Sequence, residues 1–202
     1  MTAVPTTLIA PDIPIDQTFI WTVEQYEDMI AKGILTEADK VELLYGRIIT
    51  KMPVGERHTY CVRELNLAMT DRYRDIYLCQ QEQPIVLAPY DEPEPDYALI
   101  RQADDRYRRR KPTGADVVLV VEVAESSYDR DRGSKWKLYA THAIPEYWIV
   151  NLEAERIEVY TDPDSSRGEY RSEQSFTQQD KINSVIGEVL LSEFIPDDVW
   201  EP

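Results

Sequence analysis

The sequence predicts an α/β fold in which a mixed central β-sheet is flanked by α-helices. Two observations support this prediction. Residues 116–124 read DVVLVVEVA, an apolar run broken by one charge, which is typical of a strand buried on both faces. Residues 131–143 have a helical pattern and residues 145–151, PEYWIVN, read as a second strand. Together they predict a right-handed βαβ unit with parallel strands.

In the first part of the chain, the sequence predicts two helices with a strand-containing segment between them. Thr22 and Gln25 have the spacing of a capping box, and the helix that they begin should stop at Gly33. Residues 41–52 predict either a strand pair or a helix end that turns into a strand. Residues 57–73 should form a helix packed on the sheet, because their apolar side chains recur mostly at helical spacing.

Further strands complete the predicted sheet. Short strands are expected near 76–80 and 84–88, and another at 97–100 after the rigid EPEP segment. Residues 156–162 and 169–176 alternate like an antiparallel pair joined by the turn-rich PDSSRG. The tail, residues 181–202, adds a short apolar piece, VLLSEF, and a polar end.

Length and composition predict one domain over residues 19–202, preceded by an extended arm, residues 1–18. The chain has 202 residues and is 43% hydrophobic, enough for a sizeable core. The arm contains three prolines, no periodic pattern and no signal-peptide features. Because no segment approaches the ~20 apolar residues of a membrane span, we expect a cytoplasmic protein without a membrane partner, with Cys61 and Cys79 reduced.

Charge is unevenly distributed along the chain. The net charge is −16, which would repel nucleic acid. Residues 101–137 hold ten basic and seven acidic residues, or 10 − 7 = +3, and the remainder of the chain is 12 − 31 = −19. The basic island is compatible with a nucleic-acid face and equally compatible with a solvated loop.

Two carboxylates, Asp96 and Glu122, are candidate ligands of a metal ion. Five apolar residues, Val117 to Val121, lead into Glu122, and a buried carboxylate is costly unless it is paired, solvated or bound to a cation. Asp96 begins the strand-like PDYALI. Acids from adjacent strands can meet and bind Mg²⁺, and a nearby ammonium can orient the attacking water or stabilise charge on the phosphate.

The segments PDYALI, VVLVVEVAESS and DRDRGSKWKLYATHAIPEYWIVN resemble the Uma-type (Uma-two) family of restriction endonucleases, in the PD-(D/E)XK nuclease superfamily. The upstream VELLYGRIITKMPVGERH is similar to the N-terminal signature of the same family. The resemblance runs from about residue 22 to 195 and is most specific over 116–151. It implies a restriction-endonuclease-like fold and a divalent-metal phosphodiesterase.

One departure concerns the lysine of the superfamily pattern, which follows the acid and a spacer on the same strand. Those places are Glu122, Val123 and Ala124 here, so the strand has no lysine. Side chains two apart share a strand face, and Ala124 leaves space beside Glu122 for an amine from the next helix.

Lys135 is the preferred amine and Lys137 the second choice. On a helical wheel the inner side is formed by Trp136, Leu138, Tyr139, Ala140 and Ala143. Lys135 lies nearer the centre of this side than Lys137, and it matches the lysine position of the family, four residues before a tyrosine.

Each of these residues also has a structural interpretation. Glu122 could pair with Arg130 or Arg132 at a strand end, Asp96 could form an Asx-turn after Pro95, and Lys135 could be a solvated helix residue. The order and context of the three residues favour the site.

Glu42 and His58 match family positions, and Glu42 is a candidate for a water-mediated contact to the metal. With two histidines and no cysteine pair at ligand spacing, a structural zinc site is not expected. No glycine-rich phosphate loop or nucleophile elbow is present in the sequence.

The predicted function is metal-dependent hydrolysis of phosphodiesters, most plausibly of DNA. Asp96, Glu122 and the carbonyl of Val123 would hold Mg²⁺ or Mn²⁺, and Lys135 would position the attacking water. A homodimer is expected, because cutting both strands of a duplex calls for two sites. The alternatives are a non-catalytic binding protein that keeps the fold and a hydrolase of small phosphodiesters.

Overall fold

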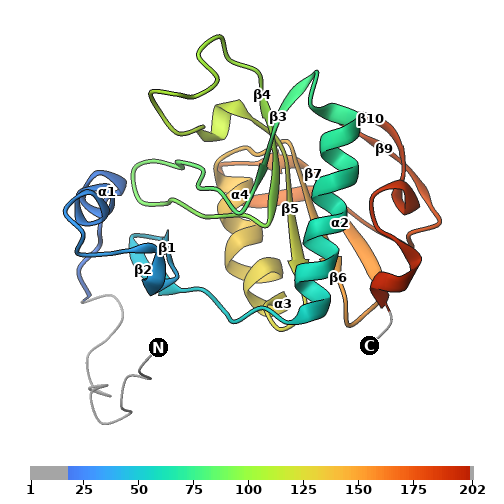
Figure 1. Ribbon diagram of the computed structural model, residues 1–202, viewed down its shortest axis with the longest axis horizontal. Helices are drawn as coiled ribbons and strands as arrows, with labels where there is room; N and C mark the ends of the chain where they lie inside the picture. Colours follow the sequence, from blue (N-terminus) through green and yellow to red (C-terminus); the bar gives the residue numbers. More distant parts are fainter. Residues whose placement is uncertain (1–17, 201–202) are drawn as a thin grey trace. The chain divides into compact units, whose positions relative to one another are not determined.

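The computed structural model describes residues 18–200, which group into two compact units (Figure 1). The first unit is the described part of Met1–Lys51 together with Leu87–Pro93, and the second is Met52–Val86 with the described part of Glu94–Pro202. The arm predicted for residues 1–18 lies, apart from Thr18, outside the described residues. The expectation of one domain over 19–202 stays a prediction.

The first unit contains a helix and a hairpin. Helix α1 (Val23–Ala31) begins with the predicted capping box, in which the backbone N–H groups of Thr22 and Gln25 each donate to the side chain of the other residue. Strands β1 (Val41–Leu44) and β2 (Arg47–Thr50) pair antiparallel. Tyr45 and Gly46 join them with φ of 52° and 66°, the left-handed geometry of a tight hairpin turn. The strand-pair interpretation of residues 41–52 is therefore confirmed.

A six-stranded sheet in the order β3-β4-β5-β6-β7-β8 forms the centre of the second unit. Its strands are β3 (Tyr77–Gln81), β4 (Tyr97–Arg101), β5 (Val117–Ala124), β6 (Glu146–Asn151), β7 (Arg156–Asp164) and β8 (Glu169–Phe176). Only β5 and β6 are parallel, and the other neighbours are antiparallel. The mixed sheet and the parallel βαβ unit are as predicted.

Helices cover both faces of this sheet. Helix α2 (Glu56–Tyr73) packs its apolar side against a core that includes Val121, Val123 and Trp148. The crossover from β5 to β6 consists of α3 (Tyr128–Arg130), a π-helical turn (Asp131–Lys135) and α4 (Trp136–Thr141). Its Tyr139 ring packs on Tyr147 at 5.0 Å between centroids. Because Tyr147 and Trp148 point to opposite faces of β6, the crossover and α2 lie on opposite faces.

Three predicted details are wrong. Residues 84–88 form only isolated bridge pairs at Val86 and Leu87, since Pro84 has no N–H to donate to a ladder. The helix predicted over 131–143 begins with the π turn, continues as α4 and ends at Thr141. Ala143, predicted on the inner side of that helix, is exposed beyond its end with φ of 54°.

The tail and the cysteines complete the second unit. The tail forms a hairpin, β9 (Lys181–Ser184) with β10 (Gly187–Leu190), followed by short 3-10 turns at Leu191–Glu193 and Asp197–Trp200. Cys61 and Cys79 are both free, as expected. Among the described helices, none has the length and apolar character needed to cross a bilayer.

Candidate metal centre at the ends of β4 and β5

The strand ladder brings the two predicted acids together. Tyr97 is the first residue of β4 and pairs with Val121 of β5, so Asp96 lies directly before the ladder and Glu122 directly after its last pair. The Asp96 carboxylate accepts the backbone N–H of Val123 at Oδ2, at 2.7 Å. The backbone N of Asp96 lies 3.4 Å from Oε2 of Glu122. The two carboxylates are therefore neighbours at one end of the sheet.

Glu122 is held from the crossover side by two donors on the same oxygen. Its Oε1 accepts from Nζ of Lys135 at 2.9 Å and from the hydroxyl of Tyr139 at 2.8 Å. Lys135 and Tyr139 are four residues apart, which places them on one side of the helix. The side chains of Lys135 and Glu122 are only 7% and 3% exposed. Oε2 of Glu122 has, among the described residues, only the long contact to Asp96.

Asp96 is held from the opposite face by His58 in the first turn of α2. Nε2 of His58 lies 3.1 Å from Oδ2 of Asp96, the oxygen that also accepts the Val123 N–H. Within residues 18–200, Oδ1 of Asp96 has no hydrogen-bond partner, and the side chain is 17% exposed. Each acid thus has one oxygen that accepts two donors and a second oxygen that is open or nearly so.

The local electrostatics favour a cation. Burial raises the pKa of Glu122. The charge of Lys135 lowers this pKa, and the carboxylates of Asp96 and Asp131 raise it further. Burial would also raise the pKa of Asp96, but the His58 hydrogen bond and the positive charges of His58 and Lys135 hold that pKa below its usual value. The pKa of Glu122 stays raised in spite of Lys135, so the ionised form of Glu122 is only partly compensated, and a bound cation would stabilise that form.

The structure brings Lys135, and not Lys137, to the acids. Lys137 is exposed, and its side chain lies beside Gly168 in the turn between β7 and β8. Ala124, in the superfamily lysine position, is fully buried. The amine beside Glu122 therefore comes from the π turn rather than from the strand.

The structural alternatives for these residues are wrong in this geometry. Glu122 pairs with neither Arg130 nor Arg132 in the described structure, and Arg132 binds Glu173 at 2.8 Å instead. Asp96 does not form an Asx-turn, because its carboxylate bonds to Val123, 27 residues along the chain. Lys135 is buried rather than solvated.

The two auxiliary candidates lie in different units. His58 contacts Asp96, as described above. Glu42 is a buried residue of β1 in the first unit, where it pairs in register with Ile49. Across residues 18–200, three or more His, Cys, Asp and Glu side chains do not gather into a ready metal-ligand cluster. A cation at this site would depend on the two acids, main-chain oxygen and water.

Sequence reasoning missed two residues of the site. Tyr139 was used as part of the inner helix face and as the tyrosine of the family spacing, but its hydroxyl, which donates to Glu122, was given no role. Asp131 is buried, and its charge acts on Glu122. The available signal was spacing, because Asp131, Lys135 and Tyr139 recur every four residues around the turn that faces the strand.

Comparison with known proteins agrees with this fold. A family model named Uma2, described as "Putative restriction endonuclease", matches residues 23–191. The chain belongs to the Uma2 family. No curated protein matches this Uma2 chain.

Among solved structures, this Uma2 protein is similar to the crystal structure of "a putative nuclease belonging to DUF820" from Anabaena variabilis. The TM-score is 0.60 at 13% identity, and the alignment covers 86% of this chain and 99% of the other. At this identity the likeness shows the fold, an α/β arrangement shared with a nuclease-fold protein.

Proposed function

We propose that this Uma2 protein is a divalent-metal-dependent phosphodiesterase, an endonuclease that hydrolyses DNA. One observation carries the proposal. Asp96 and Glu122 lie side by side at the end of β4 and β5, each with one oxygen held by protein donors and the other turned toward neither a lysine nor a histidine. Membership of a restriction endonuclease family supports the same reading.

The donor set fits Mg²⁺ or Mn²⁺, which take oxygen ligands and keep several waters. The open oxygens, Oδ1 of Asp96 and Oε2 of Glu122, would be the carboxylate ligands. The carbonyl of Val123 is the third, because the N–H and C=O of a strand residue face the same neighbour and this N–H faces Asp96. A bound cation of this kind polarises a phosphoryl oxygen and lowers the pKa of a water nucleophile.

The protein's own side chains orient the reaction. Lys135 places an ammonium beside the acids, where it positions the attacking water and stabilises negative charge that develops on the phosphate. Tyr139 and His58 fix the orientations of the two carboxylates from opposite faces of the sheet. Cleavage of both strands of a duplex needs two such sites, so the proposal includes a homodimer.

The test is cleavage of plasmid, single-stranded DNA and structured RNA at low salt with Mg²⁺ or Mn²⁺. The parent is compared with Lys135→Ala and with Lys137→Ala as the matched control. Metal-dependent cutting that is lost only in Lys135→Ala supports the proposal. Cutting that survives in Lys135→Ala contradicts the assigned lysine, and no cutting by folded parent contradicts the nuclease.

Metal binding is tested separately by calorimetry with Mn²⁺. Asp96→Ala and Glu122→Gln should each weaken binding while the protein stays folded. If both variants bind Mn²⁺ as tightly as the parent, the ligand assignment is wrong.

A second candidate function is hydrolysis of a small phosphodiester, which the net charge of −16 favours over a polymeric substrate. Turnover of bis(p-nitrophenyl) phosphate without cleavage of any nucleic acid would select it. Lys135→Ala should abolish that turnover too, because the same site would perform the reaction.

A further inference from the structure

Positive charge is concentrated in the segment that follows β4. We name residues 101–111, RQADDRYRRRK, the basic loop. It contains six basic and two acidic residues, a net charge of 6 − 2 = +4, whereas the rest of the chain has 16 − 36 = −20. A local concentration of this kind in an acidic protein needs an explanation beyond solubility, since the acidic surface already provides that.

Three arginines of the basic loop have no partner. Arg106, Arg108 and Arg109 are exposed, and within the described chain their guanidinium groups make no hydrogen bond or ion pair. Elsewhere in the second unit, several arginines are paired with carboxylates, as in the pairs Arg72–Glu193 and Arg132–Glu173. The loop therefore gathers three unpaired guanidinium groups within four residues of one turn, Arg106 to Arg109.

Contacts of Arg110 and Tyr107 hold the basic loop in one conformation. Arg110 makes two hydrogen bonds to the carboxylate of Asp116, at 2.6 and 3.0 Å, and its guanidinium lies 4.8 Å from the centre of the Tyr107 ring. The hydroxyl of Tyr107 donates to the carbonyl of Arg101 at 2.7 Å. Arg106 and Tyr107 both have left-handed backbone, with φ of 50° and 58°. A fixed turn presents the free arginines, so binding would lose less conformational entropy than ordering a flexible segment.

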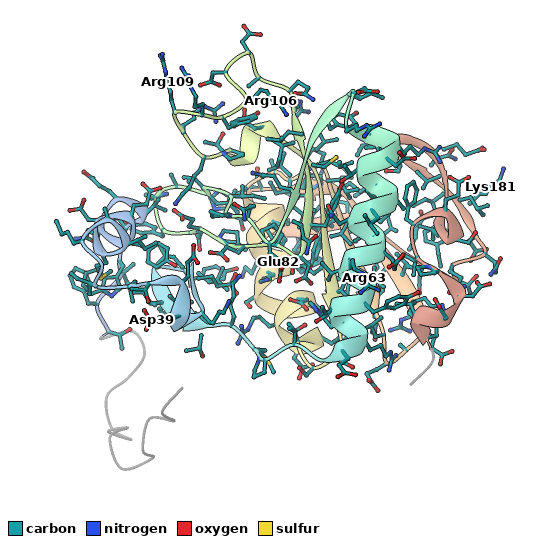
Figure 2. All side chains as sticks on the ribbon, in the orientation of Figure 1. Asp39, Arg63, Glu82, Arg106, Arg109 and Lys181 are labelled. Atoms are coloured by element: carbon teal, nitrogen blue, oxygen red, sulfur yellow. The ribbon has the colours of Figure 1, made fainter. Side chains whose placement is uncertain are left out.

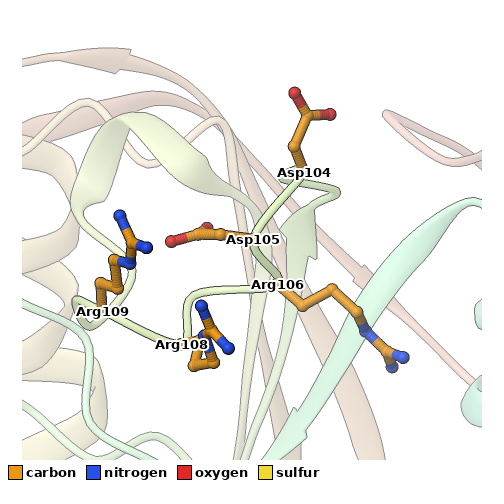
Figure 3. A pocket seen from close by; sticks show the side chains of 5 residues that line it. All are labelled: Asp104, Asp105, Arg106, Arg108 and Arg109. Atoms are coloured by element: carbon orange, nitrogen blue, oxygen red, sulfur yellow. The ribbon is translucent and has the colours of Figure 1, made fainter.

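The free arginines surround an open cleft. Its volume is about 480 Å³, and it is lined by Asp104, Asp105, Arg106, Arg108 and Arg109 (Figure 3). Arg108 and Arg109 extend to the same side as the carboxylate of Asp105, and Arg106 points the other way. Asp105 belongs to the turn itself, because its Oδ1 accepts the N–H of Tyr107 at 3.1 Å. Cations spread on two sides of a turn suit a run of phosphates better than one small anion.

The basic loop and the metal centre lie at opposite ends of β4. Asp96 directly precedes the strand, and Arg101 ends it. Five strand residues at ~3.4 Å each separate the two by about 17 Å. Duplex DNA covers that distance in about five base pairs. A polymer can reach both places, whereas a mononucleotide cannot.

We propose that the basic loop is a second, phosphate-binding site that grips the backbone of duplex DNA through Arg106, Arg108 and Arg109. The inference deepens the proposed function, on which it rests for the identity of the polymer. The contacts carry no base specificity, because phosphates are the same in every sequence.

The test measures binding without cleavage. A fluorescently labelled 20-base-pair duplex is titrated in EDTA with parent, the variant Arg106→Ala/Arg108→Ala/Arg109→Ala and a control, Arg63→Ala/Arg167→Ala/Lys181→Ala. The control loses the same three charges from exposed positions elsewhere, two of which are labelled with Arg106 and Arg109 in Figure 2. Circular dichroism checks that both variants are folded.

The basic-loop variant should bind at least about tenfold more weakly, and its plot of log K against log salt should be shallower by about 3. The control should match the parent. Equal affinity and slope in the two triple variants would overturn the proposal, as would a parent that binds no duplex. Because the assay contains no metal, these outcomes are separate from a failure of the proposed cleavage, which the plasmid assay reports.

Discussion

Two buried glutamates on the same face of the sheet differ in their hydrogen-bond partners and in the direction of their pKa shifts. Glu122 in β5 and Glu158 in β7 both lie opposite Ile149 of β6, one on each side. Both carboxylate oxygens of Glu158 accept hydrogen bonds, and the donors are Tyr128, Asn151, Arg156 and Tyr160. Burial alone would raise the pKa of Glu158, but these donors hold it below its usual value.

Glu122 differs because its donors crowd onto one oxygen. Oε1 receives Lys135 and Tyr139, and Oε2 is left beside Asp96. Its pKa is raised, whereas that of Glu158 is lowered. Burial of a carboxylate therefore does not by itself mark a site. The proposed site is distinguished by a second acid and by a carboxylate oxygen without a strong donor.

The largest effect is expected for Glu122→Gln, which keeps the side-chain shape and an acceptor for Lys135 but removes the proposed ligand charge. Cleavage should fall by about 10³-fold or more. Glu158→Gln is the matched control and should cut within about twofold of the parent, because catalysis does not involve Glu158. Plasmid cleavage rates decide between them, and equal losses in both variants would remove the distinction.

Lys135→Met should lower cleavage by about 10²- to 10³-fold, because an apolar side chain of similar length cannot stabilise charge on the phosphate. Lys137→Met changes an exposed residue beside Gly168 and should leave the rate unchanged. Single-turnover rates at saturating metal measure the chemical step. A loss that appears in Lys137→Met would move the assignment to that residue.

The stability of the fold, in contrast to cleavage, should depend on Glu158. Glu158→Gln replaces charge-assisted hydrogen bonds with neutral ones and should lower the free energy of unfolding by about 1–3 kcal/mol. Urea denaturation of parent and variant at pH 7 measures this difference. An unchanged midpoint would show that the Glu158 network contributes no net stability.

The pH dependence of that difference has a definite sign. The folded pKa of Glu158 is below its unfolded value, so the ionised carboxylate stabilises the fold above the unfolded pKa of about 4.3. This contribution is lost as the pH falls through the folded pKa. The stability gap between parent and Glu158→Gln should therefore narrow in acid, and a gap that widens would contradict the assignment.

The smallest effect is expected for Tyr139→Phe, which removes one donor from Glu122 and keeps the ring in place. Mn²⁺ affinity should fall by about tenfold, as for other residues that orient a metal ligand. Tyr170→Phe removes a comparable buried hydroxyl that donates to the carbonyl of Ile144, and it should leave the affinity unchanged. Calorimetry on both variants separates orientation of Glu122 from a general loss of packing.

The strands that carry the site could be predicted because their sequences are simple. Residues 117–124 and 146–151 are buried apolar runs, and the parallel pairing follows from the helix between them. Lys135 could be preferred over Lys137 because its spacing from Tyr139 places both on one side of the helix. Proximity of Asp96 to Glu122 followed from the expectation that their strands are adjacent.

Other features depend on contacts that a sequence pattern does not contain. The π turn widens the helix at Gly133, which a wheel of 3.6 residues per turn cannot represent. His58 reaches Asp96 from a helix 38 residues earlier, so only the tertiary fold shows the pair. The partners of Glu158 come from α3, β6 and β7, and the sequence pattern does not predict that they meet.

In the proposed mechanism, a lysine that comes from the crossover rather than from the strand would couple activity to docking of that segment. Glu122 and Lys135 are 13 residues apart on separate elements. A molecule in which the π turn undocks keeps every strand of the sheet and both acids, yet loses the ammonium beside them. Under the proposed function, local unfolding of this one short segment would abolish cleavage while the sheet stays folded.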